Sequence, residues 1–384
     1  MFYSLPYIIL ISALLMLSIL QMSLKLTSGS NKILNLATGI IFVLFFGLKG
    51  FIGWDWYNYY TFFKNLPLLS SFNFGTTQFE FGFCLYASII KSIYPNYHFF
   101  IFVSILIDFL LLNIFINRNL PKHLYIITIV FFIVMEGSIW EINLQRNIKG
   151  ILLFLVSINY IEERKATKYF LLNLVGICFH WTSILFFPLY FILHKKVPLQ
   201  LFFILFIIGN ILYLFQLNYI QPFIKFISPY FGSVAEHKTN LYLSSSLYNK
   251  QYGITIGYIE RVFTTTLVML FYEKINSIKH NRLFVNSFII YILISLYFSE
   301  VIIIITRIAN IFIFSYWVLW PNLIDINKKA SKYLLLMVMS LYLNLRLIKM
   351  TNNILYKYDN VIGESMSYSE RTKIFDKNAH YLLK

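Results

Sequence analysis

Acidic side chains are rare in this chain, so one that interrupts an apolar region is a candidate for chemistry. Asp55 lies in the stretch GWDWYNYY, next to Trp54 and Trp56 and four residues before Tyr59. Aromatic rings stack on the apolar faces of sugars, and a carboxylate accepts a hydrogen bond or a proton from a hydroxyl. The stretch therefore indicates a carbohydrate site with Asp55 as its base. A helix-capping acid within an interfacial aromatic belt is the alternative interpretation.

A second group of candidates is rich in hydrogen-bond donors. Gln145, Arg146 and Lys149 fall at the start of an apolar helix that we expect near 148–161. A helix start also presents free backbone N–H groups, and charged donors beside them suit a pyrophosphate. An arginine that only extends its charge toward the membrane surface is the alternative.

The remaining candidates are scattered along the chain. His180 lies in FHWTS, where a helix break is expected, and could donate to a phosphate, shuttle a proton or be structural. Glu300 and Arg307 are seven residues apart, so they could share one face of a continuous helix or form an ion pair. Glu80 lies in the segment after the aromatic stretch, and Arg261 lies in a later apolar run.

The composition decides what kind of scaffold must position these residues. Of 384 residues, 59% are hydrophobic and 12% are charged, and the mean hydropathy is +0.69. A soluble domain is about half apolar and about a quarter charged. Several apolar runs reach about 20 residues, the length that spans a bilayer. We expect an all-α polytopic integral membrane protein with about 11–13 transmembrane or re-entrant helices and no soluble domain.

The apolar runs also suggest the domain organisation. We expect residues 1–349 to form a single transmembrane helical domain with an outer-face cavity, and 350–384 to form a polar C-terminal tail. Two segments, 79–94 and 169–193, are ambiguous because they are short or interrupted. The expected spanning helices lie near 5–24, 33–52, 98–116, 123–140, 148–161, 199–216, 253–272, 283–304, 306–324 and 333–349.

The basic loops suggest the topology. Six short loops each carry two or three Lys or Arg residues, and such loops collect on the cytoplasmic side. All six lie on one side if 79–94 does not cross the membrane and 169–193 turns back near His180. A single helix over 169–193 is the alternative. With the turn, the candidate residues gather at the outer face, where ionisable groups at membrane depth usually line a functional cavity.

The charge balance limits the partners. The chain has 32 basic and 16 acidic residues, which in a soluble protein would suggest nucleic acid. In a membrane protein the excess fits loop charge and an anionic lipid-linked ligand, so we expect no nucleic-acid partner. Cys84 and Cys178 both lie in apolar runs, and we therefore expect no disulfide, metal cluster or cofactor.

Four pieces occur in order over most of residues 33–324: GWDWYNYYTFF, FEFGF, a long stretch that begins LQRNIKG and includes FHWTS, and EVIIIITRIANIF. Together they resemble the EpsG family, a branch of the Wzy-type bacterial polysaccharide polymerases. In two places the chain departs from the family pattern, with Asn147 where Gln is usual and Gly150 where Ala is usual. The matching residues are Gly53, Asp55, Tyr59, Glu80, Gly82, Arg146, His180, Thr182, Ser183 and Arg307, with Phe312 near a usual Tyr.

The resemblance implies a glycosyltransferase at the outer face of the bacterial cytoplasmic membrane. It would join oligosaccharide repeat units carried on undecaprenyl pyrophosphate, for O-antigen, capsule or exopolysaccharide. Its partners would be those lipids, the bilayer, a chain-length regulator and a flippase. Cations would stabilise the leaving pyrophosphate, and a carboxylate would activate the acceptor hydroxyl. The expected cations are Arg146 and Arg307, then Lys149, Arg261 and His180; the expected bases are Asp55, Glu80 or Glu300.

Two other functions fit a basic membrane cavity. A flippase or transporter of the same lipid-linked sugars often shows repeated halves, and none is evident in this sequence. A membrane O-acyltransferase that modifies the polysaccharide would pair His180 with an acid, and none lies near it in sequence.

Overall fold

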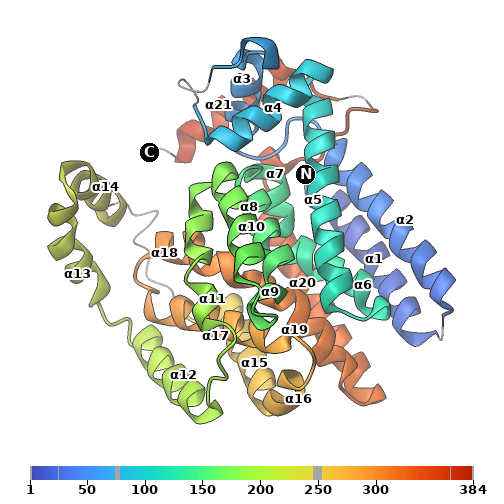
Figure 1. Cartoon of the computed structure of the whole chain (residues 1–384), viewed down its shortest axis with the longest axis vertical. Helices are drawn as coiled ribbons and strands as arrows, with labels where there is room; N and C mark the ends of the chain where they lie inside the picture. Colours follow the sequence, from blue (N-terminus) through green and yellow to red (C-terminus); the bar gives the residue numbers. More distant parts are fainter. Residues whose placement is uncertain (1, 25, 74–77, 245–252, 364, 383–384) are drawn as a thin grey trace. The chain divides into compact units, whose positions relative to one another are not determined.

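The computed structural model describes residues 2–24, 26–73, 78–244, 253–363 and 365–382. This described part is built of helices and turns and contains no strand, only an isolated bridge between Lys49 and Asn360 (Figure 1). It divides into two compact units, which are described separately. Unit 1 comprises Met1–Ile192 with Asn327–Lys384, and unit 2 comprises Leu193–Ile326.

Five stretches in unit 1 are long and apolar enough to cross a membrane. They confirm the predicted all-α polytopic membrane protein. They are α1 (Leu5–Ser23), α2 (Ser28–Gly47), α5 (Tyr97–Asn119), the stretch Lys122–Asn143 and α20 (Lys329–Thr351). Shorter apolar helices of 10–17 residues are Phe81–Ile93, Ala166–Phe179 and Trp181–Ile192 in unit 1 and Leu199–Leu214 and Asn281–Tyr297 in unit 2. The last two fall where the sequence predicted spanning helices.

The remaining elements of unit 1 are short. In Figure 1, α3, α4 and α21 gather at one end of the unit. These elements are α3 (Trp56–Asn65), η1 (Leu69–Ser71), α4 (Phe81–Ile93), η2 (Lys122–Leu124), α6 (Tyr125–Phe132), η3 (Ile133–Gly137), α7 (Ser138–Asn143), α8 (Asn147–Ser157), α9 (Asn159–Glu162), α10 (Ala166–Phe179), η4 (Trp181–Phe186), α11 (Leu189–Ile192), η7 (Ile354–Tyr356) and α21 (Tyr368–Leu382).

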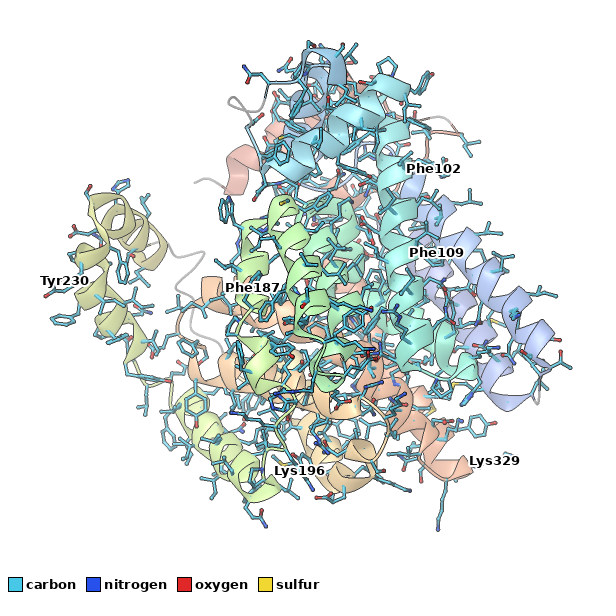
Figure 2. The ribbon with its side chains drawn as sticks, in the orientation of Figure 1. Phe102, Phe109, Phe187, Lys196, Tyr230 and Lys329 are labelled. Carbon is cyan, nitrogen blue, oxygen red and sulfur yellow. The ribbon has the colours of Figure 1, made fainter. Side chains whose placement is uncertain are left out.

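The segment 169–193 is a hairpin, which confirms the predicted turn near His180. α10 ends at Phe179, and η4 and α11 return beside it. The Tyr169 hydroxyl donates to the Phe186 carbonyl at 2.5 Å, and Phe187 lies 5.4 Å from Phe170 between ring centroids (Figure 2). Residues far apart along the segment are thus side by side, which a single helix would not allow.

The second ambiguous segment, 79–94, contains α4, a helix of 13 residues. At 1.5 Å per residue it is about 20 Å long, too short to cross a bilayer core of about 30 Å. Lys91 near its end donates to the carbonyls of Phe63, Lys64 and Leu66 at 2.6–2.9 Å. These bonds tie α4 to the end of α3, as expected for a segment that does not cross.

The stretch Lys122–Asn143 contains a kink. Its π-helical turn η3 has non-helical backbone at Met135 and at Glu136, where φ is +74°. Arg346 on α20 donates to the Val134 carbonyl at 3.2 Å and to the Glu136 carboxylate at 2.6 Å. The arginine thereby supplies hydrogen bonds where the regular helix pattern is interrupted.

The tail after α20 packs back onto the segment that follows α2. The backbone N–H of Gly50 donates to the Asp359 carbonyl at 2.9 Å, and that of Val361 donates to the Leu48 carbonyl at 2.9 Å. Arg371 on α21 lies 3.5 Å from the Asp359 carboxylate and donates to the Lys357 carbonyl at 2.7 Å. Both members of this ion pair are buried, with side-chain exposures of 2% and 7%.

Unit 2 differs from the sequence prediction in two helices. The helix expected over 283–304 ends at Tyr297, and the helix expected over 306–324 is broken near Ile308. The elements of unit 2 are α12 (Leu199–Leu214), α13 (Ile220–Ile227), η5 (Ser228–Phe231), α14 (Ser233–Ser244), α15 (Ile256–Leu270), α16 (Tyr272–Asn276), α17 (Asn281–Tyr297), α18 (Ile302–Arg307), η6 (Ala309–Ile313) and α19 (Phe314–Asp325).

The buried ion pair of the tail gives a testable prediction. Arg371→Met leaves Asp359 as a buried charge without its partner, which costs about 3–5 kcal/mol of unfolding free energy. We expect a clear fall in the thermal unfolding midpoint of the purified protein in detergent. Lys377→Met, on an exposed position of the same helix, is the control and leaves the midpoint unchanged. Equal midpoints for wild type and Arg371→Met would show that the ion pair with Asp359 does not stabilise the fold.

Candidate functional site

An ion pair between Glu80 and Arg146 joins three segments of unit 1. Glu80 directly precedes α4, and Arg146 occupies the N-cap position of α8. A guanidinium nitrogen of Arg146 donates to one oxygen of Glu80. The other Glu80 oxygen accepts from the backbone N–H of Trp181 at 3.3 Å, at the start of η4. Two predicted site residues are therefore in contact, and the pair is bound to the turn of the hairpin.

Aromatic residues surround the Arg146 guanidinium. It lies 4.0 Å above the centre of the Phe79 ring and forms a hydrogen bond with the Tyr59 side chain. Burial raises the pKa of Tyr59, and the nearby Arg146 opposes that rise, so the phenol is protonated at neutral pH. The Nε–H of Arg146 is buried and has no partner in the described structure. Arg146 thus keeps a donor for a further acceptor.

His180 is held by a short chain of hydrogen bonds across the hairpin turn. Its Nδ1 lies 2.7 Å from the Thr182 hydroxyl, which donates to the Asn147 side chain at 2.9 Å. Asn147 follows Arg146 directly. The chain therefore links the predicted histidine to the start of α8. Asn147, the departure from the family pattern, is the acceptor that fixes Thr182.

Asp55 occupies the N-cap position of α3, yet its side chain makes no capping hydrogen bond. Gly53, two residues before Asp55, has φ +91°, a conformation that residues with a side chain rarely adopt. The Trp54 backbone N–H donates to the Asn143 side chain at 2.8 Å, which fixes the turn. Tyr59 is within electrostatic reach of both Asp55 and Arg146. Asp55 is half-buried and lacks the bond that would define it as a cap.

The tryptophans beside Asp55 face protein in this structure. Trp56 is 3% exposed. Phe375 of α21 lies 6.4 Å from Trp54 and 6.0 Å from Trp56 between ring centroids. The sequence could not reveal this contact, because α21 lies more than 300 residues away in a segment of polar composition. The expected sugar platform of Trp54 and Trp56 is therefore packed against the tail.

Lys149, in the first turn of α8, is bound by side chains of α5. Its Nζ donates to the Asp108 carboxylate at 2.8 Å and to the Ser104 hydroxyl at 2.7 Å, and it is 2% exposed. Gln145 is 3% exposed and forms a hydrogen bond with Tyr97. Of the three donors expected at this helix start, Arg146 is thus the one with partial exposure, at 21%.

A buried charged group beside Lys149 was missed by sequence reasoning. Lys49 is 3% exposed and donates to the backbone carbonyl of Glu141, which is itself 1% exposed. Unit 1 therefore contains a buried group of two acidic and two basic side chains, Asp108, Glu141, Lys49 and Lys149. Lys49 lies just after the end of an apolar helix, a position where a lysine usually marks the membrane surface. The sequence alone therefore could not distinguish it from a surface lysine, and only its burial in the structure does so.

The other predicted residues belong to unit 2. Glu300 accepts hydrogen bonds from the backbone N–H groups of Tyr219, Ile220 and Gln221 at 2.7–3.2 Å, so it caps α13. Arg307 is the exposed last residue of α18. Because the chain turns between α17 and α18, these two residues do not share one continuous helix.

Arg261 also lies in unit 2, on α15. Its charge is within electrostatic reach of the phenols of Tyr291 and Tyr316. Its Nε–H is buried and has no partner in the described structure. Arg261, predicted from the sequence, is thus a partly buried arginine with aromatic neighbours inside its own unit.

Close packing of α8 against the hairpin positions Arg146 and His180. Gly150 lies where a Cβ would come within 2.2 Å of the Ser183 hydroxyl oxygen, but 3.6 Å from the Ser183 Cβ. The Ser183 hydroxyl is buried and has no hydrogen-bond partner in the described structure. The missing side chain at Gly150 therefore leaves the space that the Ser183 hydroxyl occupies. This explains the second departure from the family pattern.

This packing predicts a rescue. Gly150→Ala should lower the thermal unfolding midpoint of the purified protein, because overpacking costs about 1–3 kcal/mol of unfolding free energy. Ser183→Ala should be nearly neutral alone and should restore the midpoint in the double variant. Additive effects of the two substitutions would show that these side chains do not meet.

Comparison with protein families gave one finding. The family model described as the EpsG family matches residues 32–360. That range contains both members of the Glu80–Arg146 pair, and α21 lies beyond it. Comparison with curated proteins and with solved structures gave no match.

Proposed function

Because the chain belongs to the EpsG family, we propose that it is a polysaccharide polymerase, a glycosyltransferase that joins oligosaccharide repeat units carried on undecaprenyl pyrophosphate. The proposed site faces outward from the bacterial cytoplasmic membrane, and the product is an O-antigen, capsule or exopolysaccharide. The observation that supports this best is Arg146, a partly exposed guanidinium with a spare donor at a helix start.

Arg146 is the proposed partner of the leaving pyrophosphate. As the glycosidic bond to the carrier lipid breaks, negative charge grows on the phosphate oxygens. A cation already fixed in place stabilises that charge without reorganising. Contacts with Glu80, Tyr59 and the ring of Phe79 hold the guanidinium in place. The guanidinium therefore does not have to move when the pyrophosphate binds.

Glu80 is proposed as a positioning residue. Both of its oxygens accept hydrogen bonds, from Arg146 and from the Trp181 backbone. With both oxygens engaged, the carboxylate holds Arg146 and the turn of the hairpin together. We therefore assign the base to Asp55, which removes the proton of the acceptor hydroxyl as that oxygen attacks the anomeric carbon.

His180 is proposed as a second phosphate donor. Its Nδ1 is engaged with Thr182, which orients the ring. When the imidazole is protonated, both ring nitrogens donate, so the ring could meet a phosphate while Nδ1 stays with Thr182. Asn147 and Thr182 would act through His180 and touch no substrate.

The role of Arg146 predicts a loss of polymer. In cells that lack this gene, wild type should restore the ladder of polymer lengths. Arg146→Ala at matched membrane levels should leave single lipid-linked units, because loss of one fixed donor lowers a rate by about 10²–10³-fold. Arg146→Lys should be intermediate, since it keeps the charge and loses the planar fork.

Arg118→Ala, at an exposed arginine of α5, is the matched control and should give a full ladder. A full ladder with Arg146→Ala would contradict the assignment. Absence of exported single units in cells without the gene would favour the flippase instead.

The role of Asp55 gives a separate prediction. Asp55→Asn keeps the shape of the side chain and removes the base, so the polymerisation rate should fall by about 10²–10⁴-fold. The measurement is chain extension on lipid-linked units in membranes that contain equal amounts of each variant. Wild-type rates for both Asp55→Asn and Asp55→Ala would exclude the acid from the reaction.

A further inference from the structure

A cavity of about 320 Å³ lies in unit 1, next to the aromatic stretch around Asp55. It is formed by the second half of α3, the end of α4 and the start of α5. Exposed residues such as Pro95 and Asn96 contribute to its lining, so it opens at the surface. Its size lies at the lower end of small-molecule sites, which begin at about 300 Å³.

Aromatic rings form one wall of this cavity. Phe51, Phe63 and Tyr97 are buried, and Tyr60 is partly exposed. The Tyr60 ring meets Tyr97 edge-on, at 5.3 Å between centroids and an interplanar angle of 81°. The face of an aromatic ring attracts the slightly positive C–H groups of a sugar. One face of Tyr60 is already stacked on Tyr368 of α21, at 4.6 Å between ring centroids, so a sugar would take the other face.

His98 supplies a polar group without a partner. Its Nδ1 is buried and has no hydrogen-bond partner in the described structure. The ring forms its hydrogen bond with the backbone of Lys49 through the other nitrogen. A neutral imidazole that donates from one nitrogen accepts at the second, and a sugar hydroxyl is a matching donor. Buried polar groups of this kind normally have partners, so a ligand hydroxyl would complete the site.

The charges at the cavity are all positive. Lys91 is held in place by its three carbonyl acceptors, and Lys64 is exposed at the rim. No aspartate or glutamate is among the described residues that line the cavity. At the start of α5, the N–H groups of His98 and Phe99 are already engaged by the Asn96 side chain. Binding of an anion would therefore rest on the lysines.

We propose that this cavity is a subsite for a sugar ring that carries a carboxylate, a uronic acid residue of the glycan. The ring stacks on Tyr60, a hydroxyl donates to His98, and the carboxylate meets Lys64 with Lys91 behind it. This inference rests on the proposed function for the origin of the sugar, but binding itself requires no polymerase chemistry. Glycans whose units contain a uronic acid would be preferred substrates.

The test measures binding of two simple glycosides to the purified full-length protein in detergent, by saturation-transfer NMR titration. The probes are methyl β-D-glucuronide and methyl β-D-glucoside, which differ in the carboxylate. Wild type should bind the glucuronide about fivefold more tightly, as expected for an ion pair near the surface. Lys64→Gln should reduce that preference and leave glucoside binding unchanged, whereas Tyr60→Leu should weaken both.

Lys279→Gln, at an exposed lysine of unit 2, is the charge-matched control and should leave both affinities unchanged. Equal binding of the two glycosides, no binding of either, or an equal effect of Lys279→Gln would overturn the proposal. Arg146→Ala separates the two proposals, because it should abolish the polymer ladder and keep the glucuronide preference. A full ladder with an intact preference would contradict the polymerase site alone.

Discussion

The ion pair between Glu80 and Arg146 is the interaction on which the candidate site depends. It joins the starts of α4 and α8 to the turn before η4, three segments that meet only through folding. An ion pair withdrawn from water costs desolvation, and this one offsets that cost through the Trp181 N–H, the Tyr59 phenol and the Phe79 ring. The same partners leave one Arg146 donor unused, which is what a site for an anion requires.

The rest of unit 1 holds these three helix starts in place. The hairpin brings His180 to Asn147, and Gly150 lets α8 approach Ser183 closely. Below them, the buried pair of Lys149 and Asp108 ties α8 to α5. On the other side, the tail packs against the aromatic stretch around Asp55, a contact made by a helix beyond the range of the family match. Rigid supports of this kind keep a charged group aimed at its ligand.

Composition was enough to predict the fold class, because backbone in lipid must satisfy its own hydrogen bonds. Loop charge was enough to predict the turn near His180, because basic loops collect on one side of the membrane. The motifs also singled out Glu80, Arg146 and His180, which the structure places around the starts of α4, α8 and η4. The sequence could not show that Lys149 belongs to Asp108, since that contact joins residues 41 positions apart. Nor could it assign Glu300 to capping, because the expected continuous helix over 283–304 hid the turn that aims this acid at α13. Which polar residues meet depends on tertiary contacts that apolar periodicity does not encode.

The central claim is that Arg146 binds the pyrophosphate of the carrier lipid. Native mass spectrometry of the purified protein, with undecaprenyl pyrophosphate and undecaprenyl monophosphate in competition, tests it directly. The account predicts that wild type retains the pyrophosphate in preference and that Arg146→Gln loses this preference while still binding both lipids. An unchanged preference in Arg146→Gln would contradict the account.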